Sequence, residues 1–349
     1  MDKRLTRIWL SSSLVAGLII SATGTSANIA HATTVRAHVT KIAIATPEKA
    51  NDYGWNQQGV RAARTVARSF GAKTVVDTGV GYDNTESVLR RLATGGASFL
   101  IAQASGYSAI APRIAQQYRI PTICYDTPSN LIRNYMSDIE TKSQQGSYLA
   151  GVLAAEKTKT NKLAIVISAA DVNWFKQSGG FIVGARSVRP HVKFVFLQIG
   201  PAAYDDAAGG KRVASTAIAS GADVIFGMGD GASFGYLQAA ETAHVGHKVW
   251  FIDVIGNKTP IDTHHVLLSS VLWNFTQVFK HAVRDINNGT YGTHIYTLNA
   301  SNGVSLLHTR YAAPAVWNLI NRDRLKILSG RIHIPLTATQ AQVQNLMRK

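Results

Sequence analysis

From Lys41 onward, short apolar runs alternate with segments whose apolar residues recur at helical spacing. This alternation, punctuated by glycine and proline, is typical of strands and helices that build a parallel sheet covered on both faces. The expected strands are 41–46, 73–80, 99–104 and 121–126, and the expected helices are 58–70, 84–94 and 107–118. This part of the chain therefore predicts a doubly wound α/β lobe.

The same alternation begins again after an expected helix at 142–157, so the chain predicts a second lobe of the same kind. Its expected strands are 162–168, 193–200, 222–229 and 248–254, and its expected helices are 176–188, 206–220 and 233–244. A further strand and helix, 265–273 and 276–287, follow the completed second lobe, so we expect the chain to return there to the first.

The predicted domain plan has a cleft between two lobes joined by several crossovers, which act as a hinge. Lobe 1 comprises 33–140 plus about 265–295, and lobe 2 comprises 141–264 plus about 296–335. A hairpin at 295–298 and 303–307, a helix at 314–328 and a C-terminal tail at 336–349 complete the plan.

The N-terminal residues 1–32 have the pattern of a cleavable signal peptide. Lys3, Arg4 and Arg7 precede the apolar run 8–20, and the A-x-A sequence at 30–32 makes Thr33 the expected mature start. The single cysteine, Cys124, lies far from this site, so we expect no lipid-modified terminus. The sequence predicts a periplasmic or secreted protein that is peripheral to the membrane.

The formal charge of the chain is +16, and removal of the signal peptide leaves +14. The basic residues are dispersed along the expected helices in runs of one or two, and no nucleic-acid motif matches. We interpret them as a solvated basic surface and expect no nucleic-acid partner.

The sequence contains no Ser-His-Asp elbow, P-loop, His-Glu-x-x-His motif or cysteine pair. The adjacent His264 and His265 would point to opposite faces of a strand, which suits one metal ion poorly. We therefore expect no catalytic residue, no metal and no cofactor.

The polar loop 47–57 follows the first strand and precedes the first helix, the position where open α/β sheets bind ligands. Asn51 or Asp52 can cap the helix or accept a ligand hydrogen bond, and Trp55 offers a flat surface for stacking. The loop alone leaves open whether Asp52 is only a cap and Trp55 only packs.

Aromatic and acidic residues recur where other strands end, so parallel strands would bring them to one edge. Two facing aromatic rings stack a flat ligand while carboxylates and amides bind its edge, although core packing stays open for each aromatic. The predicted ligand-binding residues are Asn51, Asp52, Trp55, Asn56, Ser105, Tyr107, Asp126, Trp174, Phe175, Asp205, Gly229, Asp230, Asp253 and Trp273.

Four segments resemble the basic membrane protein (PnrA-like) family of periplasmic substrate-binding proteins, partners of ABC importers. These segments are NDYGWNQ at 51–57, GSYLAGVLAA at 146–155, KTKTNK at 157–162 and GADVIF at 221–226. The resemblance covers about 41–292. It implies a type I periplasmic binding fold, a purine nucleoside or related ligand, and an ABC permease and ATPase as partners. We expect the protein to be a monomer.

Position by position, the resemblance puts the family's stacking Phe at Trp55 and a ribose-contacting Asp at Asp253. Two positions depart from the family pattern: its ribose-binding Lys falls on Trp273, and a second-lobe Phe falls on Gln177. Replacing a cationic donor by an indole removes a hydroxyl-binding group, so we expect a free nucleobase rather than a nucleoside. A sensor for another planar or sugar ligand and an exported purine-acting enzyme remain alternatives.

Overall fold

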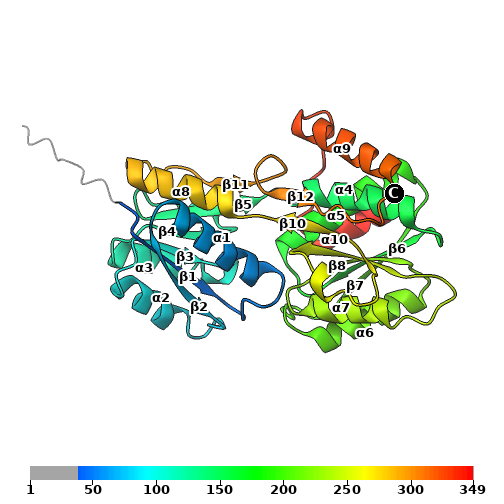
Figure 1. Ribbon diagram of the computed structural model, residues 1–349, viewed down its shortest axis with the longest axis horizontal. Coiled ribbons are helices and arrows are strands. Elements are labelled where there is room, and N and C mark those ends of the chain that lie inside the picture. The colour runs from blue at the N-terminus through cyan, green and yellow to red at the C-terminus, as the bar shows by residue number, and fades with distance from the viewer. Residues whose placement is uncertain (1–37, 349) are drawn as a thin grey trace, which may run out of the picture. The chain divides into compact units, whose positions relative to one another are not determined.

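The computed structural model describes residues 38–348 and contains two six-stranded sheets (Figure 1). The first has the order β11 (Tyr296–Leu298), β5 (Met136–Thr141), β4 (Thr122–Tyr125), β3 (Phe99–Ala102), β1 (Lys41–Thr46) and β2 (Lys73–Thr78). The second has the order β12 (Val304–Leu306), β10 (Leu267–Trp273), β9 (Trp250–Ile255), β8 (Val224–Met228), β6 (Lys162–Ile167) and β7 (Lys193–Gln198). We call the bodies built on them lobe 1 and lobe 2, and the predicted two-lobed α/β fold is confirmed.

Helices pack on both faces of each sheet, as the buried strands require. In lobe 1, α1 (Trp55–Ser69) contacts α8 (Thr276–Asn288), and α2 (Thr85–Thr94) contacts α3 (Ala111–Gln117). In lobe 2, α4 (Gln144–Lys157) contacts α5 (Val172–Val188), and α6 (Ala207–Ala219) contacts α7 (Ala232–Glu241). Short 3₁₀ turns lie at Ser105–Tyr107, Pro128–Asn130 and Thr259–Ile261.

Strand β1 shows why the sequence forms this layered core. Successive side chains of a strand point to opposite faces. Ile42 and Ile44 belong to the cluster shared with α1 and α8, whereas Ala43 and Ala45 belong to the cluster shared with α2 and α3. Both faces are buried, and this explains why the strand reads as a continuous apolar run.

The two sheets are joined by three crossovers: from β5 to α4, from β10 to α8, and from β11 to β12. Hydrogen bonds tie the crossovers together, with Lys142 N–H donating to Leu298 O (2.8 Å) and Asn274 N–H donating to Gly303 O (2.9 Å). Such short linked segments are the kind that absorb a hinge rotation.

Two of the predicted assignments at these crossovers are wrong. Strand β10, expected to return to lobe 1, is hydrogen-bonded in parallel to β9 and completes lobe 2, so the chain crosses only after Trp273. The predicted hairpin at 295–307 does not form, because β11 pairs with β5 in lobe 1 while β12 pairs with β10 in lobe 2. Its connecting turn is a crossover.

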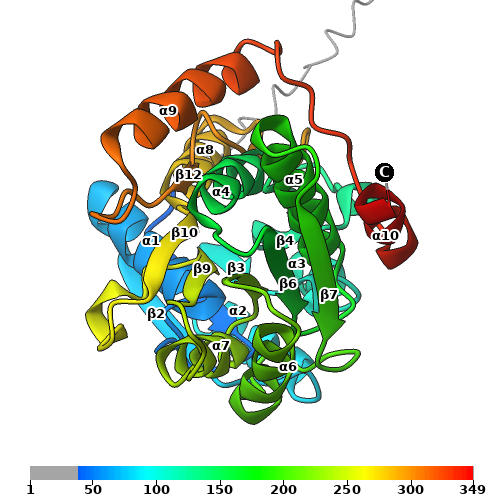
Figure 2. The same ribbon diagram turned by 90° about the vertical axis from the view of Figure 1, so that its right-hand side faces the viewer.

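The C-terminal segments pack on lobe 2 (Figure 2). Helix α9 (Pro314–Leu328) contacts α4, and α10 (Gln340–Arg348) contacts α5, where Arg186 donates hydrogen bonds to the carbonyls of Leu346 and Met347. The predicted signal peptide at 1–32 lies outside the described residues. Across 38–348, no helix combines the length and the apolar character that a membrane crossing needs.

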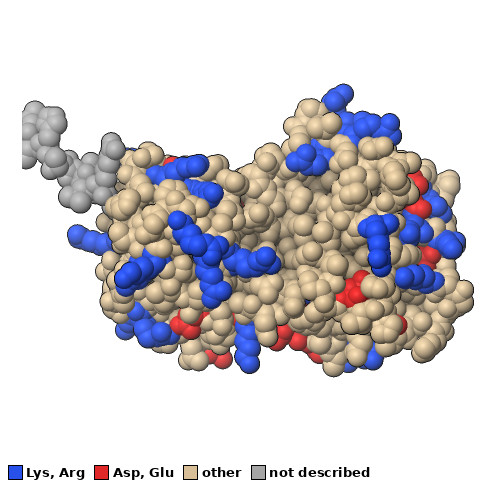
Figure 3. All heavy atoms as spheres, in the orientation of Figure 1, with Lys and Arg blue, Asp and Glu red and all other residues tan. Residues whose placement is uncertain are grey.

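Lys and Arg side chains are spread over both lobes on the face shown in Figure 3. Lys49, Arg61 and Arg64 line a shallow groove beside α1. This spread agrees with a solvated basic surface, which keeps a protein soluble without defining one binding patch.

Candidate ligand-binding site between the two lobes

A cavity lies where the carboxyl ends of the strands of both sheets face each other. Its lining residues are Pro47, Trp55, Tyr82, Ala104, Ser105, Asp126, Asp171, Asn173, Trp174, Tyr204, Asp230, Ile255 and Trp273. The cavity has a volume of about 50 Å³. The cavity therefore suits a compact ligand held by both lobes.

The indole of Trp55 is fixed in place by lobe 1. Its Nε1–H donates to Gln103 O (2.7 Å), and its ring meets Tyr125 and Phe275 edge to face, with centroids 4.7 and 5.3 Å away. Since the only polar group of the indole is already paired, Trp55 can offer the cavity only its apolar ring surface.

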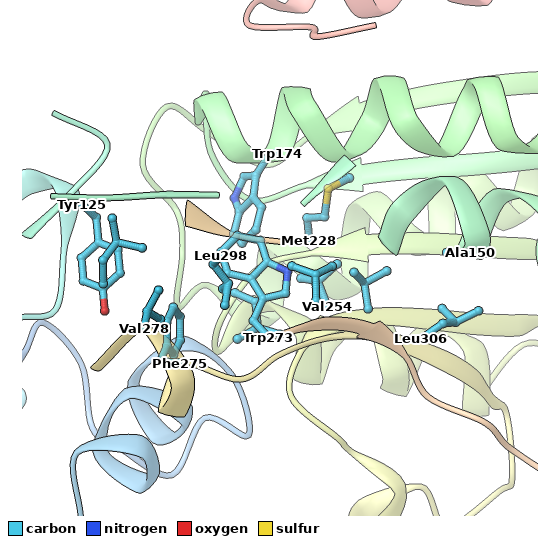
Figure 4. Packing of buried hydrophobic residues seen from close by; sticks show 14 of the residues in the cluster. Tyr125, Ala150, Trp174, Met228, Val254, Trp273, Phe275, Val278, Leu298 and Leu306 are labelled. Carbon is cyan, nitrogen blue, oxygen red and sulfur yellow. The ribbon is translucent and has the colours of Figure 1, made fainter. Parts of the chain in front are cut away.

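Trp273, the last residue of β10, lies at the start of the β10–α8 crossover among side chains of both lobes (Figure 4). Its centroid is 6.0 Å from that of Trp55, and 1% of its surface is exposed. Its indole Nε1–H has no acceptor among the described residues, whereas Trp174 Nε1–H donates to Ser168 Oγ (3.2 Å). A buried donor without a partner is unfavourable for the folded state.

Three carboxylates line the cavity, each placed by the end of a strand or the start of a helix. Asp171 caps α5 by accepting from Asn173 N–H (2.7 Å), and it also accepts from the Tyr204 hydroxyl (2.9 Å). Asp126 Oδ2 accepts from Asn173 Nδ2 (2.9 Å), and Asp230 Oδ1 accepts from Trp55 N–H at 3.4 Å.

Burial shifts the acid–base behaviour of two of these groups. Desolvation, followed by the charge of Asp171, raises the pKa of Asp126 to about 7. Desolvation, followed by the charges of Asp52 and Glu48, raises the pKa of Asp230 well above its ordinary value. A ligand that donates hydrogen bonds to these carboxyl groups would therefore stabilise their ionised forms.

The lobes also touch each other beside the cavity. The Tyr53 ring of lobe 1 meets Phe234 of lobe 2 edge to face, with centroids 6.4 Å apart. Ile255 adopts φ +67°, and Gly256 N–H donates back to Val254 O (2.8 Å), which makes a tight γ-turn with positive φ at a β-branched residue. This conformation is strained, and it sets Ile255 against the cavity and Gly256 against the loop of lobe 1.

Six of the predicted ligand-binding residues line the cavity: Trp55, Ser105, Asp126, Trp174, Asp230 and Trp273. The other eight do not. Asp52 accepts from the N–H groups of Asn56 and Gln57 (2.9 Å each), so it caps α1, and the Asn56 amide donates to Asp52 and Glu48. Asn51 is exposed and lines the shallow groove beside α1 instead.

The remaining predicted residues serve packing or internal pairing. Tyr107 is buried and donates to Gly81 O (2.8 Å), and Phe175 lies in the core. Asp253 forms a fully buried ion pair with Lys258 (2.7 Å). Asp205 is exposed beside Gly231, and Gly229 packs closely on Ser168 and Ala232.

Seven lining residues were absent from the prediction: Pro47, Tyr82, Ala104, Asp171, Asn173, Tyr204 and Ile255. Asp171, Asn173 and Tyr204 lie in strand-end segments that carry the same polar and aromatic signal, next to residues that were chosen. Ile255 carries no such signal, because only its backbone conformation brings it to the cavity. Within the described part of the chain, no group of three or more His, Cys, Asp or Glu side chains could hold a metal ion.

Comparison with known proteins identifies relatives of this chain. A family model described as "ABC transporter substrate-binding protein PnrA-like" matches residues 39–337. The nucleoside-binding protein BmpA of the ABC transporter of Lactococcus lactis is 28% identical over 55% of this chain and 58% of its own length. A CD4+ T-cell-stimulating antigen of Listeria innocua is 32% identical over 35% of this chain and 34% of its own length. The matches thus span between a third and three fifths of these curated relatives.

Solved structures show the same fold. A solute-binding protein of an ABC transporter system from Conexibacter woesei has a TM-score of 0.71 at 18% identity and covers 85% of this chain and 99% of its own. One from Actinobacillus succinogenes, solved with bound D-allose, has a TM-score of 0.60 at 14% identity over 77% and 97%.

Proposed function

This chain belongs to the PnrA-like family of ABC transporter substrate-binding proteins, and from that premise we propose that it binds a purine-type ligand between its lobes. The favoured ligand is a free nucleobase, and the partners are an ABC permease and ATPase. The protein acts as a monomeric carrier outside the cytoplasm and releases its ligand unchanged.

The observation that carries this proposal is the composition of the cavity wall. Indole rings from both lobes and from a crossover surround it, and carboxylates lie beside them. Flat aromatic surfaces stack a planar heterocycle, and carboxylates accept hydrogen bonds from its amino and ring N–H groups. The nucleoside-binding relative supports a ligand that contains a nucleobase.

The preference for a base over a nucleoside rests on Trp273. The resemblance puts a ribose-binding lysine at this position, whereas here a buried indole fills it and the cavity is small. A nucleoside would need room and donors for its ribose. A nucleobase needs neither, and it has an additional N–H where the sugar would be attached.

Trp273→Lys is expected to shift the preference from base towards nucleoside, because specificity is the difference between two binding free energies. Calorimetry with adenine, guanine and their nucleosides measures this on wild type and variant. Trp273→Phe, which keeps a ring without a cation, is the matched control. If wild type binds the nucleoside more tightly than the base, the nucleobase proposal is wrong, and if no purine binds, the purine class itself is wrong.

Trp55→Ala is expected to weaken ligand binding by roughly 1–3 kcal/mol, the usual contribution of an aromatic side chain stacked on a base. Titration of the intrinsic fluorescence or calorimetry measures the change in Kd. Trp317→Ala, on α9 and stacked on His308, tests the loss of a tryptophan outside the cavity. Equal affinity of Trp55→Ala and wild type would contradict the stacking role.

A further inference from the structure

The charged side chains that line the cavity are all acidic. Asp126, Asp171 and Asp230 line it, and within residues 38–348 no Lys, Arg or His side chain does so. The charges of Lys176 and Lys258 act on Asp126 and Asp230, but both lysines are paired elsewhere, with Glu140 (3.3 Å) and Asp253 (2.7 Å). The protein therefore supplies no countercharge inside the cavity.

Two of the three carboxyl groups that line the cavity are incompletely hydrogen-bonded, Asp126 and Asp230. Both oxygens of Asp171 are occupied, by Asn173 N–H and the Tyr204 hydroxyl. Asp126 Oδ1 is shielded from solvent and lacks a donor in the described part of the protein, and Asp230 has one long contact with Trp55 N–H. A buried carboxylate without a partner is unfavourable, and it is neutralised either by protonation or by a positively charged group that binds beside it.

The aromatic wall favours the same sign of charge. Five aromatic side chains line the cavity: Trp55, Trp174, Trp273, Tyr82 and Tyr204. The face of an aromatic ring attracts a cation, most strongly where water is excluded. A planar heterocycle also offers these rings a flat face to stack on, which an alkylammonium group does not.

We infer that the ligand is a planar heterocycle carrying a positive charge, such as an N-alkylated or protonated purine, with its cationic ring against the indoles that line the cavity and its charge beside Asp126 and Asp230. This inference rests on the proposed function of the cavity as the site of a flat ligand. It specifies that the proposed purine-type ligand carries a positive charge. The net positive charge of the protein does not oppose it, since surface charges are screened beyond about 8 Å at physiological ionic strength.

Because Asp126 ionises, the affinity for a cationic ligand should depend on pH. The groups that face this carboxyl are Asp171, Glu140, Lys176 and Asn173, and burial is the main reason that its pKa rises to about 7. At a pH below its pKa, a carboxyl group is neutral and cannot form an ion pair with a cation. Affinity for a permanent cation should therefore increase as pH rises through about 7, while affinity for a neutral isostere should stay flat or fall.

The test compares three small purines by calorimetry at pH 8. The 7,9-dimethyladeninium ion carries a permanent charge, N6,9-dimethyladenine carries two methyl groups without a charge, and 9-methyladenine is the neutral parent. We expect the cation to bind at least about tenfold more tightly than either neutral compound, the scale of a desolvated cation–aromatic contact. Asp126→Asn should reduce this advantage to less than about threefold, and Asp230→Asn provides a second variant.

Asp83→Asn, an exposed carboxylate outside the cavity, should leave the advantage unchanged. If the neutral compounds bind and the cation binds no more tightly, the inference is overturned while the proposed function stands. If none of the three purines, nor adenine or guanine, binds, the proposed function fails and the inference with it.

Discussion

Gly256→Ala is expected to weaken ligand binding on the order of 100-fold or more, although residue 256 does not line the cavity. A Cβ atom at this position would lie 1.7 Å from Tyr53 O and 2.5 Å from Tyr53 C. Both are backbone atoms of the opposite lobe, which no rotamer change can move. The Gly256 carbonyl is also held, because it accepts from the Ser270 hydroxyl (2.6 Å).

The added methyl group can be accommodated only if the lobes move apart. Each lobe keeps its own core, so we expect the variant to fold and to populate an open arrangement. Apparent affinity falls by the fraction of molecules that can still close around the ligand. The effect on Kd therefore reports the role of closure in binding.

Calorimetry of Gly256→Ala measures the Kd, and small-angle scattering measures the radius of gyration with and without a saturating ligand. Gly246→Ala is the matched control, since a Cβ there meets none of the described atoms within 4 Å. Wild-type affinity in Gly256→Ala, together with an unchanged response of the radius of gyration, would show that binding does not require this contact.

The sequence predicted the lobes well because buried parallel strands are continuous apolar runs flanked by helical patterns. Residues 41–46 were assigned with the bounds that β1 has. The first helix begins at Trp55, three residues before the predicted start, because Asp52 caps it within a loop whose polar residues hide the helical pattern. The sheet to which β10 belongs was not predictable, since both sheets bury the same kind of strand.

The sequence predicted the location of the site better than it predicted which residues line it. Strand-end polar and aromatic residues do converge, but convergence does not tell which of them face the cavity. Asp126 and Asp230 do so, whereas Asp52 and Asp253 turn to partners a few residues away along the chain, Asn56 and Lys258. Such local pairing competes with ligand binding, and the sequence pattern alone does not decide between them.

The ion pair of Asp253 with Lys258 leads to the largest expected change in stability. Both side chains have no exposed surface, their charged atoms are 2.7 Å apart, and Asp253 also accepts from the Ser233 hydroxyl (2.9 Å). Lys258→Met leaves a buried carboxylate without its countercharge. We expect the free energy of unfolding to fall by about 3–5 kcal/mol, the usual result of breaking a buried pair from one side.

The loss should depend on pH in a defined direction. Burial already raises the pKa of Asp253, and Lys258 counteracts that rise. Without Lys258 the pKa in the folded state moves further above its unfolded value, so the folded variant binds a proton more readily than the unfolded chain. The destabilisation should therefore be small near pH 4 and increase as pH rises towards 7. Chemical denaturation at several pH values measures it, with Arg90→Met in the exposed pair with Glu86 as a control that changes little.

The double variant Asp253→Leu/Lys258→Met separates structure from ligand contact. Replacing both partners of a buried pair by apolar residues is often neutral or stabilising, and the Ser233 hydroxyl keeps the Gly229 carbonyl (2.6 Å) as its acceptor. We therefore expect the double variant to recover most of the stability lost in Lys258→Met and to bind ligand, because neither side chain lines the cavity. If stability recovers and ligand binding is lost, Asp253 contacts the ligand as the family resemblance implies, and the assignment of the pair to structure alone is wrong.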